Sequence, residues 1–532
     1  MNDTAQLVLP RAAGRASSTD TTSMTKAMTE IPKRGVCAAP RVTRRGRKPC
    51  RRARTGALLL TAFALLACDL AREVTPDDPL SVGRVAIVPS DNMVTAVTVA
   101  VECSGAVSAI EVDYTATGID SGSTPRTAVA GCPTSVHVLG LLERTTYHTT
   151  IKLWGSGDSI RVVGPTLPID SLPADLPHLS AALTAGVSRG MTAFAIIDPS
   201  RLDQGLALVV DSIGRIRWYL RSSRLITDFQ PQASDRYTIA LANYEPLAFS
   251  VLGYLAGEYQ ELDVAGALRN KWTATGGYST DNHDIRLTTK GTAVLLGFDL
   301  RAMDLTSLGL SSSTEVLGNV LQEVDSAGRL LFSWNAFDHF TLADVDPAVI
   351  PLISLSPSRL DWTHANAVDV DQDGNYLVSF RHLSEVTKID SRNGAVLWRL
   401  GGVRNDFMFD SDSNEFSFQH GVRRLPTGSL IMFDNGNRHT PPFSRAIEYR
   451  LNEQTRTAQA VWQYRPTPDL FSFALGFAER LGNGNTLVTF GTSAIVQEVS
   501  PAAKLVWQVS VPAGLFVYRA YRLRSLYEIS DN

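Results

Sequence analysis

Asp211-Ser-Ile-Gly-Arg-Ile-Arg-Trp218 is the stretch that decides the fold, because its pattern returns through the C-terminal two-thirds of the chain. A turn with an aspartate and a glycine is followed within a few residues by a tryptophan, which indicates a strand, a tight turn and a second strand ending in an aromatic residue. The other clear copies run from Asp263 to Trp272, Asp325 to Trp334 and Asp390 to Trp398. Two degenerate copies end at Trp462 and Trp507.

Successive tryptophans are separated by 54, 62, 64, 64 and 45 residues, which is the length of a four-stranded propeller blade. We therefore predict an all-β chain in which residues 178–532 form a six-bladed β-propeller. The tryptophans are expected to pack between neighbouring blades rather than to hold a cofactor. Residues 518–527 are expected to complete the blade that begins near residue 205, closing the ring so that no edge strand is left.

Residues 80–170 show a second β pattern of short alternating strands, with Val97, Val99 and Val101 on one face. The run from Leu141 to Tyr147 resembles the tyrosine corner of fibronectin type III domains, in which the tyrosine hydroxyl bonds back to the turn. We predict a small immunoglobulin/fibronectin-III-like β-sandwich over 80–170. Two roles are left open for it, a dimerisation element in a homodimer or a stalk.

The N-terminal segment has the pattern of a leader. Residues 41–56 are densely basic, and an apolar stretch too short to span a bilayer follows and ends in Leu-Leu-Ala-Cys68. This ending is similar to a bacterial lipobox, in which the cysteine is acylated after cleavage. We predict a leader over 1–67 with Met24 or Met28 as alternative starts, a linker over 69–79, and an exported periplasmic or cell-surface lipoprotein held to the membrane through Cys68.

The remaining cysteines and the charge balance narrow the class of protein further. Cys103 and Cys132 are the only cysteines after the leader and its Cys68, so an exported chain is expected to join them in one disulfide. The formal net charge is -3, and no long basic run lies beyond the leader. Nucleic acid is therefore not expected as a partner.

A second motif alternates with the first and places histidines at one repeat position. It begins at His283, His364 and His420, and a fourth copy over 476–491 lacks the histidine. Because the first strand of each blade lines the central channel, residues at one repeat position lie on one ring around the axis. The three histidines are therefore expected to converge.

Arg381 and Asn366 are expected beside these histidines, Arg381 at the end of the next strand and Asn366 on the same strand face as His364. Convergent histidines allow metal ligation, nucleophilic catalysis or acid–base catalysis. A guanidinium opposes a divalent metal but binds two oxygens of a sulfuryl or phosphoryl group. We predict an anion site with no metal and no cofactor, and we interpret Asp371 and Asp373 as a solvated hairpin turn rather than a calcium site.

Three segments, 361–390, 394–402 and 416–439, resemble the bacterial arylsulfotransferase family, and the likeness extends over roughly residues 200–530. The resemblance implies a six-bladed propeller that moves a sulfuryl group from a phenolic sulfate ester donor to a phenol acceptor, through a sulfohistidine and without PAPS. It also implies that His420 is the nucleophile and that His364, Arg381 and His283 support it. From its place two residues after His364, we expect Asn366 to bind substrate. The acceptor-pocket residues are less defined, and the candidates are Thr489, Thr492, Tyr518 and Tyr521.

Two other functions fit the same residues. His283, His364 and His420 are candidate ligands of a metal-dependent hydrolase or oxygenase, which would contain stoichiometric metal. A non-catalytic, surface-anchored binding propeller is the other alternative, since a propeller scaffold serves many functions.

Overall fold

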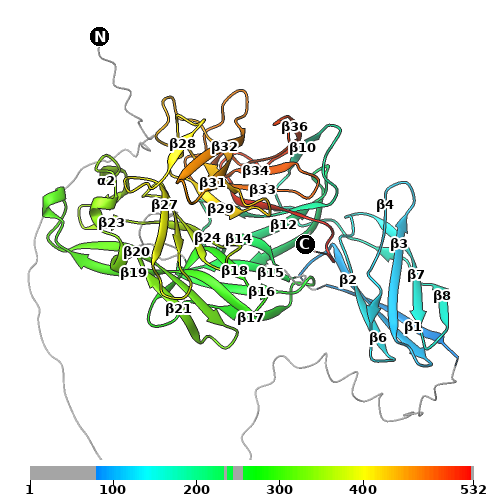
Figure 1. The fold of residues 1–532 in the computed structure, drawn as a ribbon. Coiled ribbons are helices and arrows are strands. Elements are labelled where there is room, and N and C mark those ends of the chain that lie inside the picture. The colour runs from blue at the N-terminus through cyan, green and yellow to red at the C-terminus, as the bar shows by residue number, and fades with distance from the viewer. Residues whose placement is uncertain (1–78, 91, 233–235, 244–255, 529–532) are drawn as a thin grey trace, which may run out of the picture. The chain divides into compact units, whose positions relative to one another are not determined.

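The computed structural model describes residues 79–90, 92–232, 236–243 and 256–528 (Figure 1). The predicted leader, the acylation site at Cys68 and most of the linker lie outside these residues. Within the described ranges, no helix has the length and apolar character needed to cross a membrane. Strands make up nearly all of the regular structure, so the predicted all-β class is confirmed.

The first nine strands form two packed antiparallel sheets, coloured blue and cyan in Figure 1. One sheet has the order β1 (Ser81–Pro89), β2 (Ala96–Ser104), β6 (Thr134–Leu139). The other has the order β4 (Asp120–Ser123), β3 (Ala109–Ala116), β7 (Thr146–Trp154), β8 (Ser159–Val163), with β5 (Thr127–Ala128) on β3 and β9 (Leu167–Pro168) on β7. Alternate residues such as Val99, Val112 and Ile151 fill the space between them. The Tyr147 hydroxyl accepts a hydrogen bond from the Leu142 amide at 2.9 Å, which forms the predicted tyrosine corner.

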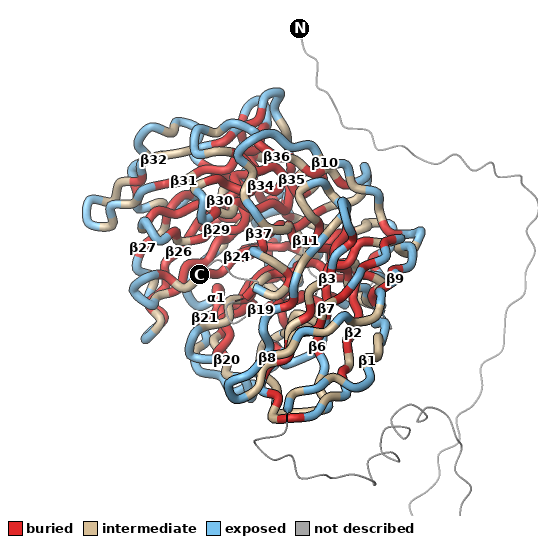
Figure 2. Tube along the Cα trace, turned by 90° about the vertical axis from the view of Figure 1, so that its right-hand side faces the viewer, coloured by how far each residue is buried: buried red, intermediate tan, exposed pale blue. Residues whose placement is uncertain are grey.

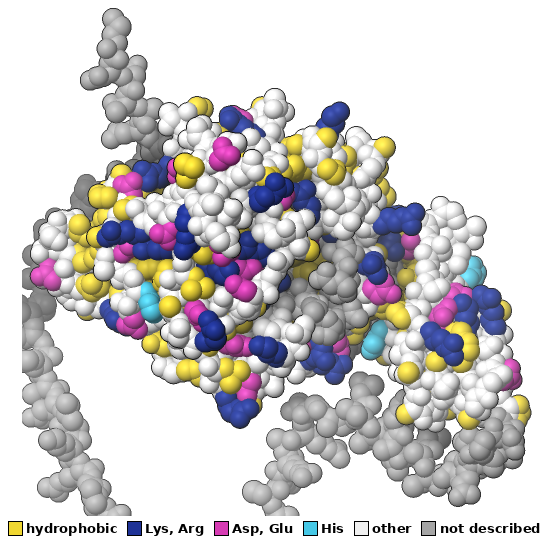
Figure 3. All heavy atoms as spheres, viewed as in Figure 1, with side chains coloured by type: hydrophobic (Ala, Val, Ile, Leu, Met, Phe, Trp, Pro, Cys, Tyr) yellow, Lys and Arg dark blue, Asp and Glu magenta, His cyan; other side chains and the backbone are white. Residues whose placement is uncertain are grey.

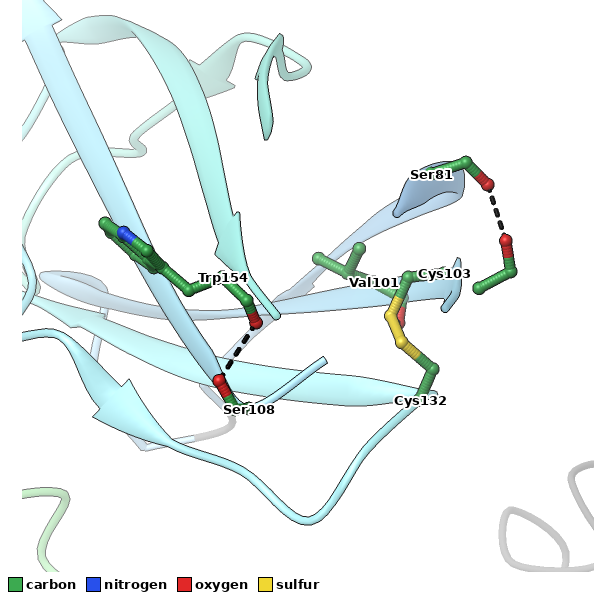
Figure 4. The surroundings of a disulfide bond; sticks show 7 residues. Ser81, Val101, Cys103, Ser108, Cys132 and Trp154 are labelled. Atoms are coloured by element: carbon green, nitrogen blue, oxygen red, sulfur yellow. Dashed lines mark hydrogen bonds between the residues drawn. A yellow bond between two sulfur atoms is a disulfide. The ribbon is translucent and has the colours of Figure 1, made fainter. Parts of the chain in front are cut away.

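The structure contains the predicted disulfide between Cys103 and Cys132 (Figure 4). Cys103 lies near the end of β2, and Cys132 comes just before the paired strand β6, so the two Cα atoms are 5.4 Å apart. The bond therefore fixes the end of the sheet against the turn that leads into β6.

The strands from β11 onward include antiparallel groups of four, two of which are joined into one larger sheet. The first group is β11 (Met191–Ile197), β12 (Gly205–Val210) and β13 (Ile216–Ser222) together with the last strand, β37 (Phe516–Leu523). The second is β14 (Leu225–Gln232), β15 (Arg236–Ala242), β16 (Ala256–Leu262), β17 (Leu268–Trp272). The third is β18 (Ser279–Leu287), β19 (Thr292–Met303), β20 (Thr314–Asp325), β21 (Leu330–Asn335), joined to the second through β16 and β18.

The remaining three groups follow in chain order. They are β24 (Ala365–Val370), β25 (Tyr376–Phe380), β26 (Glu385–Ile389), β27 (Val396–Gly401); β29 (His420–Arg424), β30 (Leu430–Asp434), β31 (Arg445–Asn452), β32 (Thr457–Tyr464); and β33 (Phe477–Arg480), β34 (Thr486–Phe490), β35 (Ile495–Val499), β36 (Leu505–Ser510). Short additions are β10 (Ser180–Leu183) on β36, β28 (Met408–Asp410) on β32, and an insertion after β21 with α1 (Ala336–His339), α2 (Ile350–Ile353), β22 (Ser354–Ser356) and β23 (Arg359–Asp361).

The chain closes the ring by pairing its last strand with the first propeller strand. β37 runs antiparallel to β11, from the Met191–Leu523 pair to the Ile197–Phe516 pair. The expectation that this blade begins near residue 205 is wrong, because β11 already starts at Met191 and residue 205 begins the next strand, β12. The closure is nevertheless of the predicted kind, since the C-terminal strand supplies the fourth strand of the first blade.

Each repeated tryptophan lies in the outer strand of its group, after the turn that the repeat predicts. Five of the six are buried, and Trp462 is partly exposed with its indole N–H donated to the Pro501 carbonyl at 3.0 Å. They act as packing residues between blades, as predicted. Figure 2 shows buried residues following the strands and exposed residues at the turns. On the face in Figure 3, basic and acidic side chains are interspersed.

The sandwich contacts the first propeller blade through buried polar groups. Arg217 of β13 donates to the Asp120 carboxylate at 2.8 Å, and both side chains are largely buried. Asp120 also accepts the hydroxyl proton of Tyr147, so the tyrosine corner is tied to the propeller. The hydroxyl of Tyr527, just beyond β37, accepts from the Leu139 amide at 2.8 Å. The sandwich thus packs where the two ends of the propeller meet.

Candidate active site at the propeller axis

The three predicted histidines begin or occupy the innermost strands of three consecutive blades. His283 lies in β18, His364 directly precedes β24, and His420 is the first residue of β29. The rings of His283 and His364 have centroids 4.9 Å apart, and the ring of Tyr518 lies 6.1 Å from His283 and 6.4 Å from His420. All three histidines are buried. The predicted convergence is therefore observed, and the ring-closing strand contributes Tyr518 to it.

His420 is held in one tautomer by neutral acceptors. Its Nδ1 lies 2.7 Å from Oδ1 of Asn435 and 3.1 Å from the Phe418 carbonyl. The orientation of the Asn435 amide is fixed because its Nδ2 donates to the carbonyls of Ser472 and Leu475. Since both partners of Nδ1 accept, Nδ1 carries the proton and Nε2 carries the lone pair.

The lone pair of His420 faces a backbone donor, because the Leu475 amide donates to Nε2 at 3.3 Å. Burial holds the pKa of His420 well below its usual value, and the nearby Arg381 charge lowers this pKa further. The imidazole is therefore neutral at pH 7, so Nε2 can act as a nucleophile without a separate base once it gives up the hydrogen bond from the Leu475 amide.

His283 and His364 differ from His420 because each has a carboxylate behind its ring. Nδ1 of His364 lies 2.6 Å from Oδ2 of Asp361, and Nδ1 of His283 lies 2.5 Å from Oδ1 of Asp281. A carboxylate accepts the Nδ1 proton, so Nε2 of both rings is the atom free to exchange a proton. The same carboxylate stabilises the ring when it becomes an imidazolium, as in an Asp–His pair of a catalytic triad.

The pKa values of the His364 pair show how burial and charge compete. Burial lowers the pKa of His364, and the neighbouring Asp361 charge opposes that effect. Burial alone would raise the pKa of Asp361, but His364, His382 and Arg381 outweigh it and lower the value to about 2. Asp361 is therefore a carboxylate throughout the neutral range.

Arg381 is positioned by its sequence neighbour, His382. Nδ1 of His382 donates to the Asp361 carbonyl at 2.6 Å, so Nε2 accepts from Nη1 of Arg381 at 2.7 Å. Nη2 of Arg381 donates to the Phe473 carbonyl at 2.9 Å. The side chain also lies over the ring of Phe418. The guanidinium thus has a fixed orientation beside the histidines.

One donor of Arg381 is left open. Among the described residues, its buried Nε has no hydrogen-bond partner. Burial lowers the pKa of Arg381 to about 10, although the Asp361 charge opposes the shift, so the group remains cationic at pH 7. A buried cation with an unused donor is suited to an oxyanion, as the sequence predicts.

His364 also stands at an unusual backbone position. Its φ is 49°, in the left-handed region, and a register shift follows between Ala365 and Ala367. Such conformations are concentrated at functional sites because the surrounding structure must hold them. Here Arg381 holds it, donating its backbone N–H to the His364 carbonyl at 3.0 Å.

Asn366 is buried near the site, but its amide points to the backbone of a neighbouring blade. Nδ2 donates to the Gln419 carbonyl at 2.6 Å, next to His420. The backbone carbonyl of Asn366 accepts a hydrogen bond from the Tyr518 hydroxyl at 3.1 Å and another from Arg519 at 2.7 Å. Arg519 in turn pairs with the buried Asp284 at 2.7 Å. Asn366 therefore connects the strand after His364 to the strand of His420.

Among the described residues, the donors that lie close enough to hold a metal ion are not the three histidines of the metal-dependent alternative. Asp361, His364 and His382 have ligand atoms within 4.8 Å of one another. However, Nδ1 of both histidines is already bonded to Asp361, and the Arg381 guanidinium is bonded to Nε2 of His382. A divalent cation would therefore lie beside a fixed positive charge, which does not suit this donor set.

The aspartates of the 369–374 turn are paired with basic side chains. The Lys388 ammonium lies 2.9 Å from Asp371 and 2.8 Å from Asp373, and Arg424 forms a second ion pair with Asp371 at 2.7 Å. The turn is therefore more than the solvated hairpin that we expected, because its carboxylates are held in ion pairs with Lys388 and Arg424.

Several residues of the site were not singled out in the sequence. Asp281 and Asp361 precede their histidines by two and three positions, a spacing that was visible but that has no meaning until the strand register is known. Asn435 follows β30 and reaches His420 across the blade. His382, the residue after Arg381, is buried against it. Of the candidate pocket residues, Tyr518 lies beside the histidines, while Thr492 bonds Ser472 at 3.0 Å.

A family model and a curated relative point to one family. The family model described as Arylsulfotransferase (ASST) matches residues 190–518. Arylsulfate sulfotransferase AssT of Escherichia coli is 24% identical over 378 residues, which are 58% of this chain and 60% of that protein. A protein of unknown function from Bacteroides caccae (TM-score 0.37, 13% identity) covers 61% of this chain and 94% of its own. The match to a catalytically inactive virginiamycin B lyase from Staphylococcus aureus (TM-score 0.33, 6% identity) covers 63% of this chain and 89% of the lyase.

Proposed function

Because the chain belongs to the arylsulfotransferase family, we propose that it transfers a sulfuryl group from a phenolic sulfate ester to a phenol through His420, without PAPS. The observation that carries the proposal is the state of His420, a neutral imidazole whose Nε2 lone pair is available beside the buried Arg381 cation. The chain spans 60% of the length of the curated relative that it matches. The activity of that relative therefore has to be tested on this chain directly.

In the first half-reaction, Nε2 of His420 attacks the sulfur of the ester. The N–S bond forms as the S–O bond to the aryl group breaks, and the electron pair leaves with the phenolate. Arg381 offers Nε to an equatorial oxygen, and a preorganised donor of this kind is worth about 3 kcal/mol in the transition state. His364 or His283, after its Nε2 has taken up a proton from solvent, gives that proton to the leaving oxygen and becomes neutral again, while the aspartate behind the ring stabilises the intervening imidazolium.

In the second half-reaction, the phenol acceptor enters after the first phenol has left. The same Asp–His pair removes the phenolic proton, and the phenolate oxygen attacks sulfur while the N–S bond to His420 breaks. His420 regains its neutral state, with the Nδ1 proton still held by Asn435. Because one substrate leaves before the next binds, ping-pong kinetics follow.

The histidines have two kinds of partner at Nδ1, an amide for His420 and a carboxylate for His364 and His283, and this difference matches the two roles proposed for them. A carboxylate behind His420 would favour its protonated form and would remove the lone pair, whereas the Asn435 amide fixes the tautomer without adding charge. Asp361 and Asp281 do the opposite for the two histidines that exchange protons. This contrast supports His420 as the nucleophile.

The test is release of p-nitrophenol from p-nitrophenyl sulfate by the mature protein, with and without phenol, in wild type, His420→Ala and the control His148→Ala. His148 is an exposed residue of the sandwich, so its loss should change nothing. We expect release that phenol stimulates, that EDTA does not reduce, and that His420→Ala abolishes. Release that survives His420→Ala would contradict the proposal, and release lost with EDTA would favour the metal-dependent alternative.

We also propose that the mature chain is exported and anchored through an acylated Cys68, as the leader pattern supports. Incorporation of labelled palmitate into wild type but not into Cys68→Ala is the expected result. A chain that retains residues before Cys68 and takes up no label would contradict the anchor.

A further inference from the structure

The loop over 470–476, which precedes β33, contacts the candidate nucleophile. Its Leu475 amide donates to Nε2 of His420, and its Phe473 carbonyl accepts from Arg381. The loop therefore contacts both groups that we expect to act on the sulfuryl group. Side chains that this loop exposes therefore lie within a few residues of backbone groups that contact His420 and Arg381.

The backbone of this loop is fixed by buried hydrogen bonds. Asn435 Nδ2 donates to the carbonyls of Ser472 and Leu475, and the buried Ser472 amide donates to the Ser444 hydroxyl at 2.9 Å. The Ser472 side chain accepts from the Thr492 amide at 2.8 Å. Ser472 is buried, whereas the side chains on either side of it in the sequence are exposed.

Those neighbours are two exposed phenylalanines. Phe471 is 41% exposed and Phe473 is 47% exposed, and no other phenylalanine, tyrosine or tryptophan in the described part of the chain is exposed to this extent. The apolar surface that these two side chains leave in water gains nothing from folding, so such a pair near a buried cationic site indicates a surface that binds something aromatic.

We propose that Phe471 and Phe473 bind the aryl ring of the sulfate donor and of the phenol acceptor, and that they select aryl over alkyl substrates. This inference deepens the proposed function. An aryl sulfate has an anionic head and a flat apolar ring. Arg381 receives the head, and the phenylalanine rings stack against the ring that projects from it.

Two probes that cannot transfer a sulfuryl group test the proposal by binding alone. Naphthalene-2-sulfonate has the anionic head and an aryl ring joined by a carbon–sulfur bond, whereas methanesulfonate has the head without a ring. Their dissociation constants are to be measured by calorimetry in wild type, Phe473→Ala, the double variant with Phe471→Ala, and Phe473→Trp. Leu268→Ala removes a similarly exposed apolar side chain from the outer strand β17 and is the control.

We expect Phe473→Ala to weaken naphthalene-2-sulfonate about tenfold, since one aromatic contact of this kind contributes about that factor. The double variant should bind it more weakly still, Phe473→Trp should restore it, and methanesulfonate should bind all variants alike. In turnover, KM for aryl donors should rise with little change in kcat.

A change below twofold for naphthalene-2-sulfonate, or an equal weakening of methanesulfonate, would overturn the inference. If wild type binds naphthalene-2-sulfonate through these rings but never turns over an aryl sulfate, the proposed function fails and the aryl-binding surface stands. Far-ultraviolet circular dichroism and melting curves of each variant show whether the fold is kept.

Discussion

Replacing Asp361 with asparagine separates proton transfer from nucleophilic attack. The exchange keeps the size of a buried side chain and removes the charge 2.6 Å from Nδ1 of His364. Two unit charges about 4 Å apart interact by about 4 kcal/mol at an effective dielectric constant of about 20. This corresponds to about three pKa units, so the ability of His364 to carry a proton falls by about a thousandfold at most.

The cost depends on how much the leaving oxygen needs that proton. Phenolate is a poor leaving group and p-nitrophenolate a good one, so we expect Asp361→Asn to slow release from phenyl sulfate about 10²- to 10³-fold, within the usual range for general acid catalysis. Release from p-nitrophenyl sulfate should fall much less. The assay is kcat/KM for a series of donors that differ in the pKa of the leaving phenol, plotted for wild type and variant.

Asp281→Asn is the matched variant, because it removes the corresponding carboxylate from His283. If one pair alone exchanges the proton, the two variants will differ in their dependence on the leaving group. The reasoning is refuted if Asp361→Asn and Asp281→Asn both slow all donors by the same factor, or slow none, because neither carboxylate would then act through proton transfer. Melting curves and circular dichroism of both variants show whether the fold is kept.

Three further predictions concern stability. Arg217→Ala leaves the Asp120 carboxylate buried without its partner and should lower the free energy of unfolding by about 3 kcal/mol in urea denaturation. Reduction of the bond between Cys103 and Cys132, 29 residues apart, should destabilise the sandwich by about 3–4 kcal/mol, seen as a lower melting temperature with reductant. Burial lowers the pKa of His420, so the unfolded chain takes up a proton that the folded chain does not; stability should fall below pH about 6.5, by about 1.4 kcal/mol per pH unit for each such histidine.

Each of these predictions has a result that would contradict it. Arg221→Ala breaks an ion pair with Asp175 in which both side chains are exposed, so it should cost less than 1 kcal/mol, and an equal loss in Arg217→Ala would show that the buried pair adds nothing. A melting temperature unchanged by reductant would mean that the disulfide does not constrain the unfolded sandwich. Urea midpoints that are equal at pH 7.5 and pH 5.5 would show that the buried histidines accept protons in the folded state.

The sequence alone determined the features that repeat along the chain. The Asp–Gly turn followed by tryptophan is a local pattern, and its recurrence from Trp218 to Trp507 predicts blades whatever the rest of the fold. Equivalent positions in equivalent blades must lie on one ring, so the convergence of His283, His364 and His420 was also predictable. Arg381 was found in the same way, because it ends the strand that pairs with the strand after His364.

Only the tertiary structure decided which ring nitrogen of each histidine carries the proton. Asn435 reaches His420 from the adjacent strand, Leu475 reaches it from a loop 55 residues away, and Arg519 reaches Asp284 across 235 residues. No periodicity indicates such partners, because they depend on strand register, on a left-handed residue at His364 and on the closure of the ring by β37. A tautomer is set by hydrogen bonds, and these exist only once distant segments have been brought together.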